Sequence, residues 1–235
     1  AIPNPTAILE DATEQTVNLA GIGEGAANES GQTLTLTAVS DNIALIPNPV
    51  AVDYTEGNAT GAVRYTPTAN AFGTAVITVT VQDSGGVTPG DDTITRQFTV
   101  VVNPVADTPS ITNATTLPNT QTTSGLVVSR NAVDGAEVTH YQITNIQNGS
   151  LFQNNGTTAI AANSFITHAE ASAGLKFTPA LNFQGDATFQ LQASTSNVVG
   201  GLGGNVVTAT ISVSERVSID TPNAGDNDAA EGGVN

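Results

Sequence analysis

The chain has 235 residues, with 21 acidic and 5 basic side chains and a formal net charge of −16. A surface of that sign repels nucleic acid and anionic membranes, so we expect neither as a partner, whereas metal cations are favoured. The absence of Cys excludes disulfide bonds and thiolate chemistry. No stretch approaches the roughly 20 consecutive apolar residues that a membrane helix needs, so we expect no membrane insertion.

The first half of the chain predicts β-strands. Residues 33–39 and 75–81 alternate between apolar and polar side chains, and the alternation predicts that Ile77, Val79 and Val81 face a core. A Gly-rich loop over 83–92 follows, and then a second alternating strand with Phe98, Val100 and Val102 on its apolar face. This succession of strand, loop and strand is typical of a β-hairpin at the end of a domain.

The second half repeats the first. Residues 63–70 (VRYTPTAN) are answered by residues 175–182 (LKFTPALN), and the register continues through Gly73 and Gly185 into a second pair of alternating strands, whose core residues are predicted to be Phe189, Leu191, Ala193, Val207, Ala209, Ile211 and Val213. Further strands are predicted over 126–129 and 138–143. Only residues 168–173 favour a helical turn, which Gly174 would end.

A stiff linker separates the two copies. It reads NPVADTP over residues 103–109, and its two prolines favour extended backbone. We place the domain boundary at 106–108, which predicts a domain over 1–107, a second domain over 108–216 and a linker-like acidic tail over 217–235. The tail repeats the linker motif Asp-Thr-Pro at residues 220–222.

Many short strands with turn residues between them predict an all-β protein of two tandem β-sandwich domains. Three motifs occur with this pattern, namely LEDAT over 9–13, YTPTAN over 65–70 and VNPVADTP over 102–109. With them, residues 5–216 resemble the bacterial cadherin-like and Ig-like tandem repeats of large extracellular, adhesin-type surface proteins. The resemblance implies a seven-strand Greek-key sandwich, serial stacking of domains, an extracellular or bacterial cell-surface location and no catalytic activity.

The resemblance also implies Ca2+ at junctions between domains, where several oxygen ligands must converge. Mapped onto this chain, the junction ligands would be Glu10, Asp11, Asn103, Asp107, Asp134 and Glu137. A second site, at the opposite end of the first domain or between subunits, would use Glu29, Asp83, Asp91 and Asp92. The alternative is that these acids are ordinary solvated loop residues.

Two departures from the family pattern favour that alternative. The Asp-x-Asp expected in the first copy reads Asn28-Glu29-Ser30. In the second copy, Pro118 and Asn119 replace Glu10 and Asp11, Thr195 replaces Asp83, and Gly203 and Gly204 fall where Asp91 and Asp92 stood. Most of the acidic side chains therefore belong to the first copy and the linker.

Catalysis has little support in the sequence. His140 and His168 are the only histidines, and the strand pattern places His140 on a solvent-facing side. No G-x-S-x-G elbow occurs, and the Gly-rich segments at 21–25 and 200–204 do not open a helix after a strand, as a phosphate-binding loop would. We therefore expect no enzyme.

The function predicted from the sequence is a structural one. The chain would be a building block of a bacterial fibre, sheath, surface layer or stalk, joined head to tail to copies of itself or to like domains. The alternative is an adhesin segment that binds a glycan or a surface protein through its loop tips. Exposed aromatic clusters usually mark such sites, and the chain has only 7 Phe, 3 Tyr and no Trp.

Overall fold

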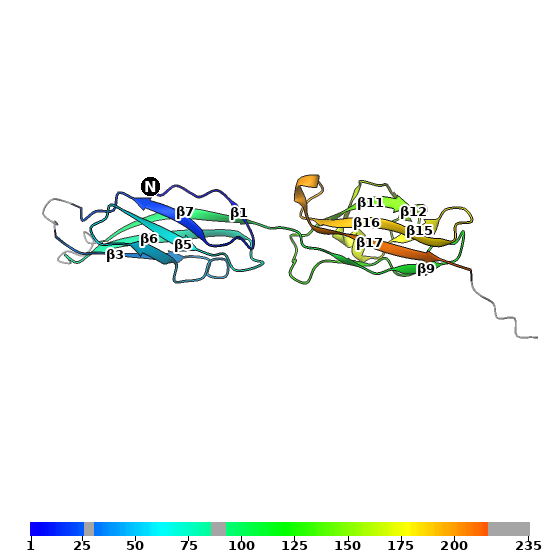
Figure 1. The fold of residues 1–235 in the computed structure, drawn as a ribbon, viewed down its shortest axis with the longest axis horizontal. Helices are drawn as coiled ribbons and strands as arrows, with labels where there is room; N and C mark the ends of the chain where they lie inside the picture. Colours follow the sequence, from blue (N-terminus) through cyan, green and yellow to red (C-terminus); the bar gives the residue numbers. More distant parts are fainter. Residues whose placement is uncertain (26–30, 86–92, 216–235) are drawn as a thin grey trace, which may run out of the picture.

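The computed structural model describes residues 1–25, 31–85 and 93–215. Figure 1 shows two β-modules that follow one another along the long axis, with a single stretch of chain between them. The first module contains strands β1 to β7 and the second contains β8 to β17, and we call residues 104–109, between β7 and β8, the linker. The predictions for the acidic tail, Glu29, Asp91 and Asp92 lie outside the described residues.

The first module is a sandwich of two sheets. One sheet has the order β1-β7-β6-β3 and the other the order β2-β5-β4. The edge strand β1 runs parallel to β7, and the other pairs are antiparallel. This arrangement confirms the predicted seven-strand sandwich. The strands are β1 (Ile8–Leu9), β2 (Gln15–Ala20), β3 (Leu34–Ser40), β4 (Ala51–Tyr54), β5 (Thr60–Tyr65), β6 (Gly73–Asp83) and β7 (Thr93–Asn103).

Alternation along β6 and β7 builds the first core, because successive side chains of a strand point to opposite faces. Ile77 and Val79 of β6 are buried as predicted, whereas Val81 near the end of the strand is only half-buried. The long strand β7 contributes the predicted Phe98, Val100 and Val102. The opposite sheet closes this core with Val17, Leu19, Val63 and Tyr65.

The second module is also a β-sandwich, with more and shorter strands. Its main sheet has the order β14-β11-β16-β17-β9, and the facing strands form the sheets β13-β12-β15 and β10-β8. The elements are β8 (Ser110–Ile111), β9 (Ala114–Thr116), β10 (Val128–Ser129), β11 (His140–Gln147), β12 (Gly149–Phe152), β13 (Ala159–Ile160), β14 (Phe165–Thr167), α1 (His168–Ser172), β15 (Lys176–Pro179), β16 (Gly185–Ser194), the 3-10 turn η2 (Val199–Gly201) and β17 (Leu202–Val213).

Two predicted elements of the second module are shorter than expected. The strand expected over 126–129 contains only Val128–Ser129, because Leu126 has a φ of 54° and positive φ is incompatible with extended backbone. The helical turn α1 ends at Ser172 and is followed by Gly174 at φ 87°. Its N-terminus has a capping box formed by Thr167 and Glu170.

The repeat seen in the sequence is also a repeat of contacts. In the first module, Asp11 Oδ1 accepts a hydrogen bond of 2.8 Å from the backbone N–H of Asn70. In the second module, Asn119 Oδ1 accepts one of 2.7 Å from the N–H of Asn182. All four residues have positive φ, between 57° and 61°. The same hydrogen bond between two loops therefore occurs in both modules, with a carboxylate as the acceptor in one copy and an amide oxygen in the other.

Two separate hydrophobic cores flank the linker. The first lies among residues 17–102 and the second among residues 106–213. Ala106 of the linker is 1% exposed and belongs to the second core. Independent folding of the two modules, with the boundary at 106–108, stays a prediction. None of the helices in the described residues has the length and hydrophobicity needed to cross a membrane.

Candidate functional site

Four acidic residues, Glu10, Asp107, Asp134 and Glu137, lie around the linker, and the first module holds its N-terminal half. Glu10 follows strand β1, and its backbone N–H donates to the carbonyl of Asn103 at the end of β7, at 2.9 Å. This bond extends the pairing of β1 with β7 and directs the Glu10 side chain along the linker. Glu10 Oε1 then accepts a hydrogen bond of 2.6 Å from the backbone N–H of Val105.

The second module holds the C-terminal half of the linker through its loop between β10 and β11. The backbone N–H of Asp107 donates to both carboxylate oxygens of Asp134, at 3.1 and 3.3 Å. Asn131 Nδ2 donates to the carbonyl of Thr108 at 3.1 Å. Asp134 is itself fixed, because its N–H donates to the carbonyl of Asn131 at 3.2 Å.

Electrostatic repulsion links the carboxylates at this junction. Burial is the largest cause that raises the pKa of Glu10, and repulsion by Asp11, Glu137 and Asp107 adds to it, although the hydrogen bond from Val105 acts in the opposite direction. Burial also raises the pKa of Asp134, with repulsion from Asp107 and Glu137. Glu10, Asp107, Asp134 and Glu137 therefore lie close enough to repel one another, and their role as calcium ligands stays a prediction.

These carboxylates fit a calcium site poorly, because backbone N–H groups already donate hydrogen bonds to three of the four, namely Glu10, Asp134 and Glu137. Glu10 and Asp134 bind the linker, Asp11 binds the N–H of Asn70, and Glu137 Oε1 accepts from the N–H of Gly135. One oxygen, Glu137 Oε2, is buried and has no hydrogen-bond partner among the described residues. Within the described ranges, no group of three or more Asp, Glu or His side chains is arranged to hold a metal ion.

The remaining predicted ligands do not add to this site. The side chain of Asn103 makes no hydrogen bond among the described residues, and the residue contributes its carbonyl to Glu10. Asp83 lies at the end of β6, and its Oδ1 accepts a hydrogen bond of 2.9 Å from the N–H of Gly85 two residues later. Asp83 therefore stabilises its own turn.

Sequence reasoning singled out Asp134 but missed the other residues of the second module that contact the linker. Gly203 and Gly204 pack directly on Ala106, Asp107 and Thr108. The repeat did single out these two glycines, as replacements of acidic residues, but nothing in the sequence shows that they contact the linker. Asn205 adds a hydrogen bond of 2.8 Å from its backbone N–H to Thr108 Oγ1.

The two histidines lie in the second module, and His168 contacts a tyrosine. Its Nδ1 lies 3.1 Å from the hydroxyl of Tyr141, and burial raises the pKa of Tyr141 to about 12. Burial, with repulsion from Arg130, lowers the pKa of His168. This pair joins α1 to β11. His140 lies on the outward-facing side of β11, as predicted, and its ring contacts Thr139.

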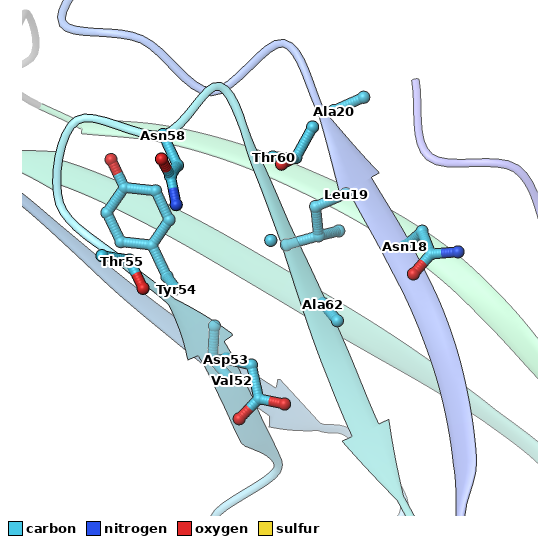
Figure 2. Close-up of a pocket in the computed structure, with 11 residues that line it drawn as sticks. Asn18, Leu19, Ala20, Val52, Asp53, Tyr54, Thr55, Asn58, Thr60 and Ala62 are labelled. Carbon is cyan, nitrogen blue, oxygen red and sulfur yellow. The ribbon is translucent and has the colours of Figure 1, made fainter.

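A shallow groove lies on the sheet β2-β5-β4 of the first module (Figure 2). Asn18 on β2 and Asp53 on β4 both pair with Ala62 on the central strand β5, so a small side chain separates an amide from a carboxylate. Asp53 forms an ion pair with Arg64. Asn58 and Thr60 line the end of the groove toward the turn between β4 and β5. The groove offers several polar groups above small side chains.

Comparison with known proteins gives one family match. Residues 3–100, which make up nearly all of the first module, match the family model of the bacterial Ig domain. This match confirms the resemblance predicted from the sequence. No curated protein matches the chain.

Several solved structures match the chain at low sequence identity. The titin domains Z1Z2 in complex with telethonin match with 11% identity over 90% of this chain and 91% of that chain, at a TM-score of 0.35. Mouse cadherin-23 EC22–24 matches with 16% identity over 91% of this chain and 63% of that chain, at a TM-score of 0.44. Human CDH23 EC21–23 matches with 14% identity over 88% of this chain and 66% of that chain, at a TM-score of 0.45. The chain thus spans about two thirds of these two cadherin fragments.

Proposed function

From the match of residues 3–100 to the bacterial Ig domain, we propose that this chain is a non-enzymatic structural segment of a bacterial extracellular or cell-surface assembly. The observation that carries the proposal is the junction, where a short linker is bonded to both modules. Such a connection suits a protein that transmits a fixed spacing along its length. Its partners would be copies of itself or like modules, joined head to tail in a fibre, sheath, surface layer or stalk.

The two ends of the chain differ, which supports a head-to-tail arrangement. Residues 1–107 carry 12 of the 21 acidic side chains, whereas residues 108–216 carry only 5. Contacts between unlike ends leave one end of each subunit open, so they can continue into a fibre, whereas contacts between like ends close a pair. Calcium, which the resemblance implied, is not required by this proposal, because the junction carboxylates fit it poorly.

Electron micrographs of the purified chain over a range of concentrations test the proposal. We expect regular filaments or sheets for the full chain and single particles after deletion of residues 217–235, which begin a second copy of the linker motif. Single particles at every concentration, for the full chain as well, would contradict assembly by this chain. Filaments from the truncated chain would show that the tail is not the connector.

The groove favours a second candidate function, the binding of a glycan. Saccharide hydroxyls suit a surface where an amide and a carboxylate flank a small side chain, as Asn18 and Asp53 flank Ala62. Titration of the chain with oligosaccharides, followed by the NMR signals of these residues, tests it. We expect Asn18→Ala to weaken binding and Asn145→Ala, on the second module, to leave it unchanged. Equal shifts in both variants would remove this candidate.

A further inference from the structure

The linker is bonded to both modules at positions only two residues apart. The N–H of Val105 donates to Glu10 of the first module, and the N–H of Asp107 donates to Asp134 of the second. Ala106, between them, is 1% exposed and packs in the second core. Between these two N–H groups, only the backbone dihedral angles of Val105 and Ala106 could change the angle between the modules, and such a rotation would move the buried Ala106.

Two glycines near the start of β17 tighten the same contact. A Cβ atom built on Gly203 would lie 2.2 Å from the carbonyl oxygen of Ala106, and one built on Gly204 would lie 2.3 Å from the N–H nitrogen of Thr108. Both distances are far below van der Waals contact, so these positions admit only glycine while the linker stays in place. Gly204 also has a φ of 62°, a conformation that glycine adopts without a steric penalty.

We propose that this junction is a metal-independent clamp, in which carboxylate-to-amide hydrogen bonds from Glu10 and Asp134, together with the close packing of Gly203 and Gly204, fix the orientation of the two modules. The clamp supplies what a bound cation would otherwise supply, namely a connection between the linker and both modules. Hydrogen bonds to ionised carboxylates are among the stronger hydrogen bonds in proteins, which suits them to this role. The inference concerns one chain and holds whether or not the chain assembles.

Residual dipolar couplings of the full chain measure the orientation directly. For the unmodified chain, we expect the couplings of both modules to fit one alignment tensor, with the same result in excess EGTA and in millimolar calcium. Gly203→Ala should separate the couplings into two tensors, because the new methyl group displaces the linker. The matched control is Gly200→Ala in the preceding turn η2, where a Cβ meets nothing within 4 Å, and it should keep one tensor.

Substitutions of Asp134 distinguish a clamp made of hydrogen bonds from a junction held by calcium. Asp134→Asn keeps an oxygen that can accept from the N–H of Asp107, so one tensor should remain, whereas Asp134→Ala should give two. Two tensors for the unmodified chain in EGTA would show that a cation and not the clamp fixes the junction. Two tensors in Asp134→Asn, as in Asp134→Ala, would show the same. One tensor in Gly203→Ala would also overturn the inference. The NMR spectrum of each module confirms that a variant remains folded.

Discussion

Asp11 and Asn119 perform the same task in the two modules. Each adopts positive φ and accepts a hydrogen bond from the N–H of the paired loop residue, Asn70 or Asn182. Asp and Asn tolerate this conformation better than most residues, because their short polar side chains can hydrogen-bond locally. An amide does in the second copy what a carboxylate does in the first, so the charge of Asp11 is not needed for the contact.

We therefore expect Asp11→Asn to change the free energy of unfolding of the first module by less than about 0.5 kcal/mol. Asp11→Ala should lower it by about 2 kcal/mol, since the variant loses a hydrogen bond worth about 1 kcal/mol and places a Cβ residue without local bonding at positive φ. Urea denaturation followed by circular dichroism measures both changes. A loss in Asp11→Asn as large as that in Asp11→Ala would show that the negative charge itself is required.

The burial of His168 makes the second module sensitive to pH. Burial and the nearby Arg130 lower the pKa of His168, so the folded module binds a proton less readily than the unfolded chain does. The contribution of this group to stability is therefore present at neutral pH, and it falls as the pH drops below the ordinary histidine pKa of about 6.5. Glu10 and Asp134 have raised pKa values and act in the opposite direction, nearer the pKa of a carboxyl group.

Between about pH 7.5 and 5.5, above the ordinary carboxyl range, we expect the melting temperature of the second module to fall. In His168→Gln this decrease should be smaller, because glutamine does not titrate. His140→Gln is the control, since that ring lies on the outward-facing side of β11. Differential scanning calorimetry at several pH values measures the effect. An equal decrease in His168→Gln would assign the sensitivity to another group.

At the scale of elements, an asparagine side chain accepts a hydrogen bond from a backbone N–H at the edge of the last strand in each module. Asn4 Oδ1 accepts a hydrogen bond of 2.8 Å from the N–H of Thr99 on β7, and Asn113 Oδ1 accepts one of 2.8 Å from the N–H of Thr210 on β17. Unpaired backbone groups at a sheet edge favour pairing with another chain. These two asparagines therefore protect equivalent strands where the short strands β1 and β9 do not reach.

We expect Asn113→Ala to lower the free energy of unfolding of the second module by about 1 kcal/mol, the usual contribution of one hydrogen bond. Asn4→Ala should have a similar effect on the first module. Asn113→Asp keeps a hydrogen-bond acceptor, so its loss of stability should be smaller. Asn58→Ala, at an exposed turn, is the control. Thermal unfolding measures the changes, and light scattering measures any increase in aggregation. An unchanged stability in Asn113→Ala would show that water replaces the side chain without loss.

At the scale of the whole molecule, the separate cores predict two units of unfolding. Ile77 is fully buried in the first core and Phe189 in the second, and no residue belongs to both core clusters. A cavity in one core should not weaken the packing of the other, because the linker contributes only Ala106 to the second core. The clamp connects the modules through hydrogen bonds and backbone contacts alone.

Ile77→Ala should lower the stability of the first module by about 2–5 kcal/mol, and Phe189→Ala that of the second by about 3–5 kcal/mol. Each variant should leave the other module unchanged. Hydrogen exchange of the full chain, measured residue by residue, assigns the loss to one module or to both. A loss shared by both modules would contradict independent folding and the boundary at 106–108.

The sequence by itself determined several of the strands and part of each core. Alternation of apolar residues has a direct physical meaning in a strand, so Ile77, Phe98, Phe189 and Ile211 were assigned to cores correctly. The repeat located the linker, and its prolines indicated an extended path. The sequence also indicated that Glu10, Asp107, Asp134 and Glu137 meet, although this rested on a family resemblance and not on the residues alone.

Only the tertiary structure decided what those acids do. Glu10 and Asp134 bind backbone amides of the linker, and Gly203 and Gly204 leave room for it. No pattern along the chain encodes these contacts, because they depend on loop conformation and on the approach of segments that are distant in sequence. The sequence around a loop carboxylate does not distinguish whether the carboxylate will bind a cation, water or an amide. The difference arises when folding brings a particular N–H within hydrogen-bonding distance.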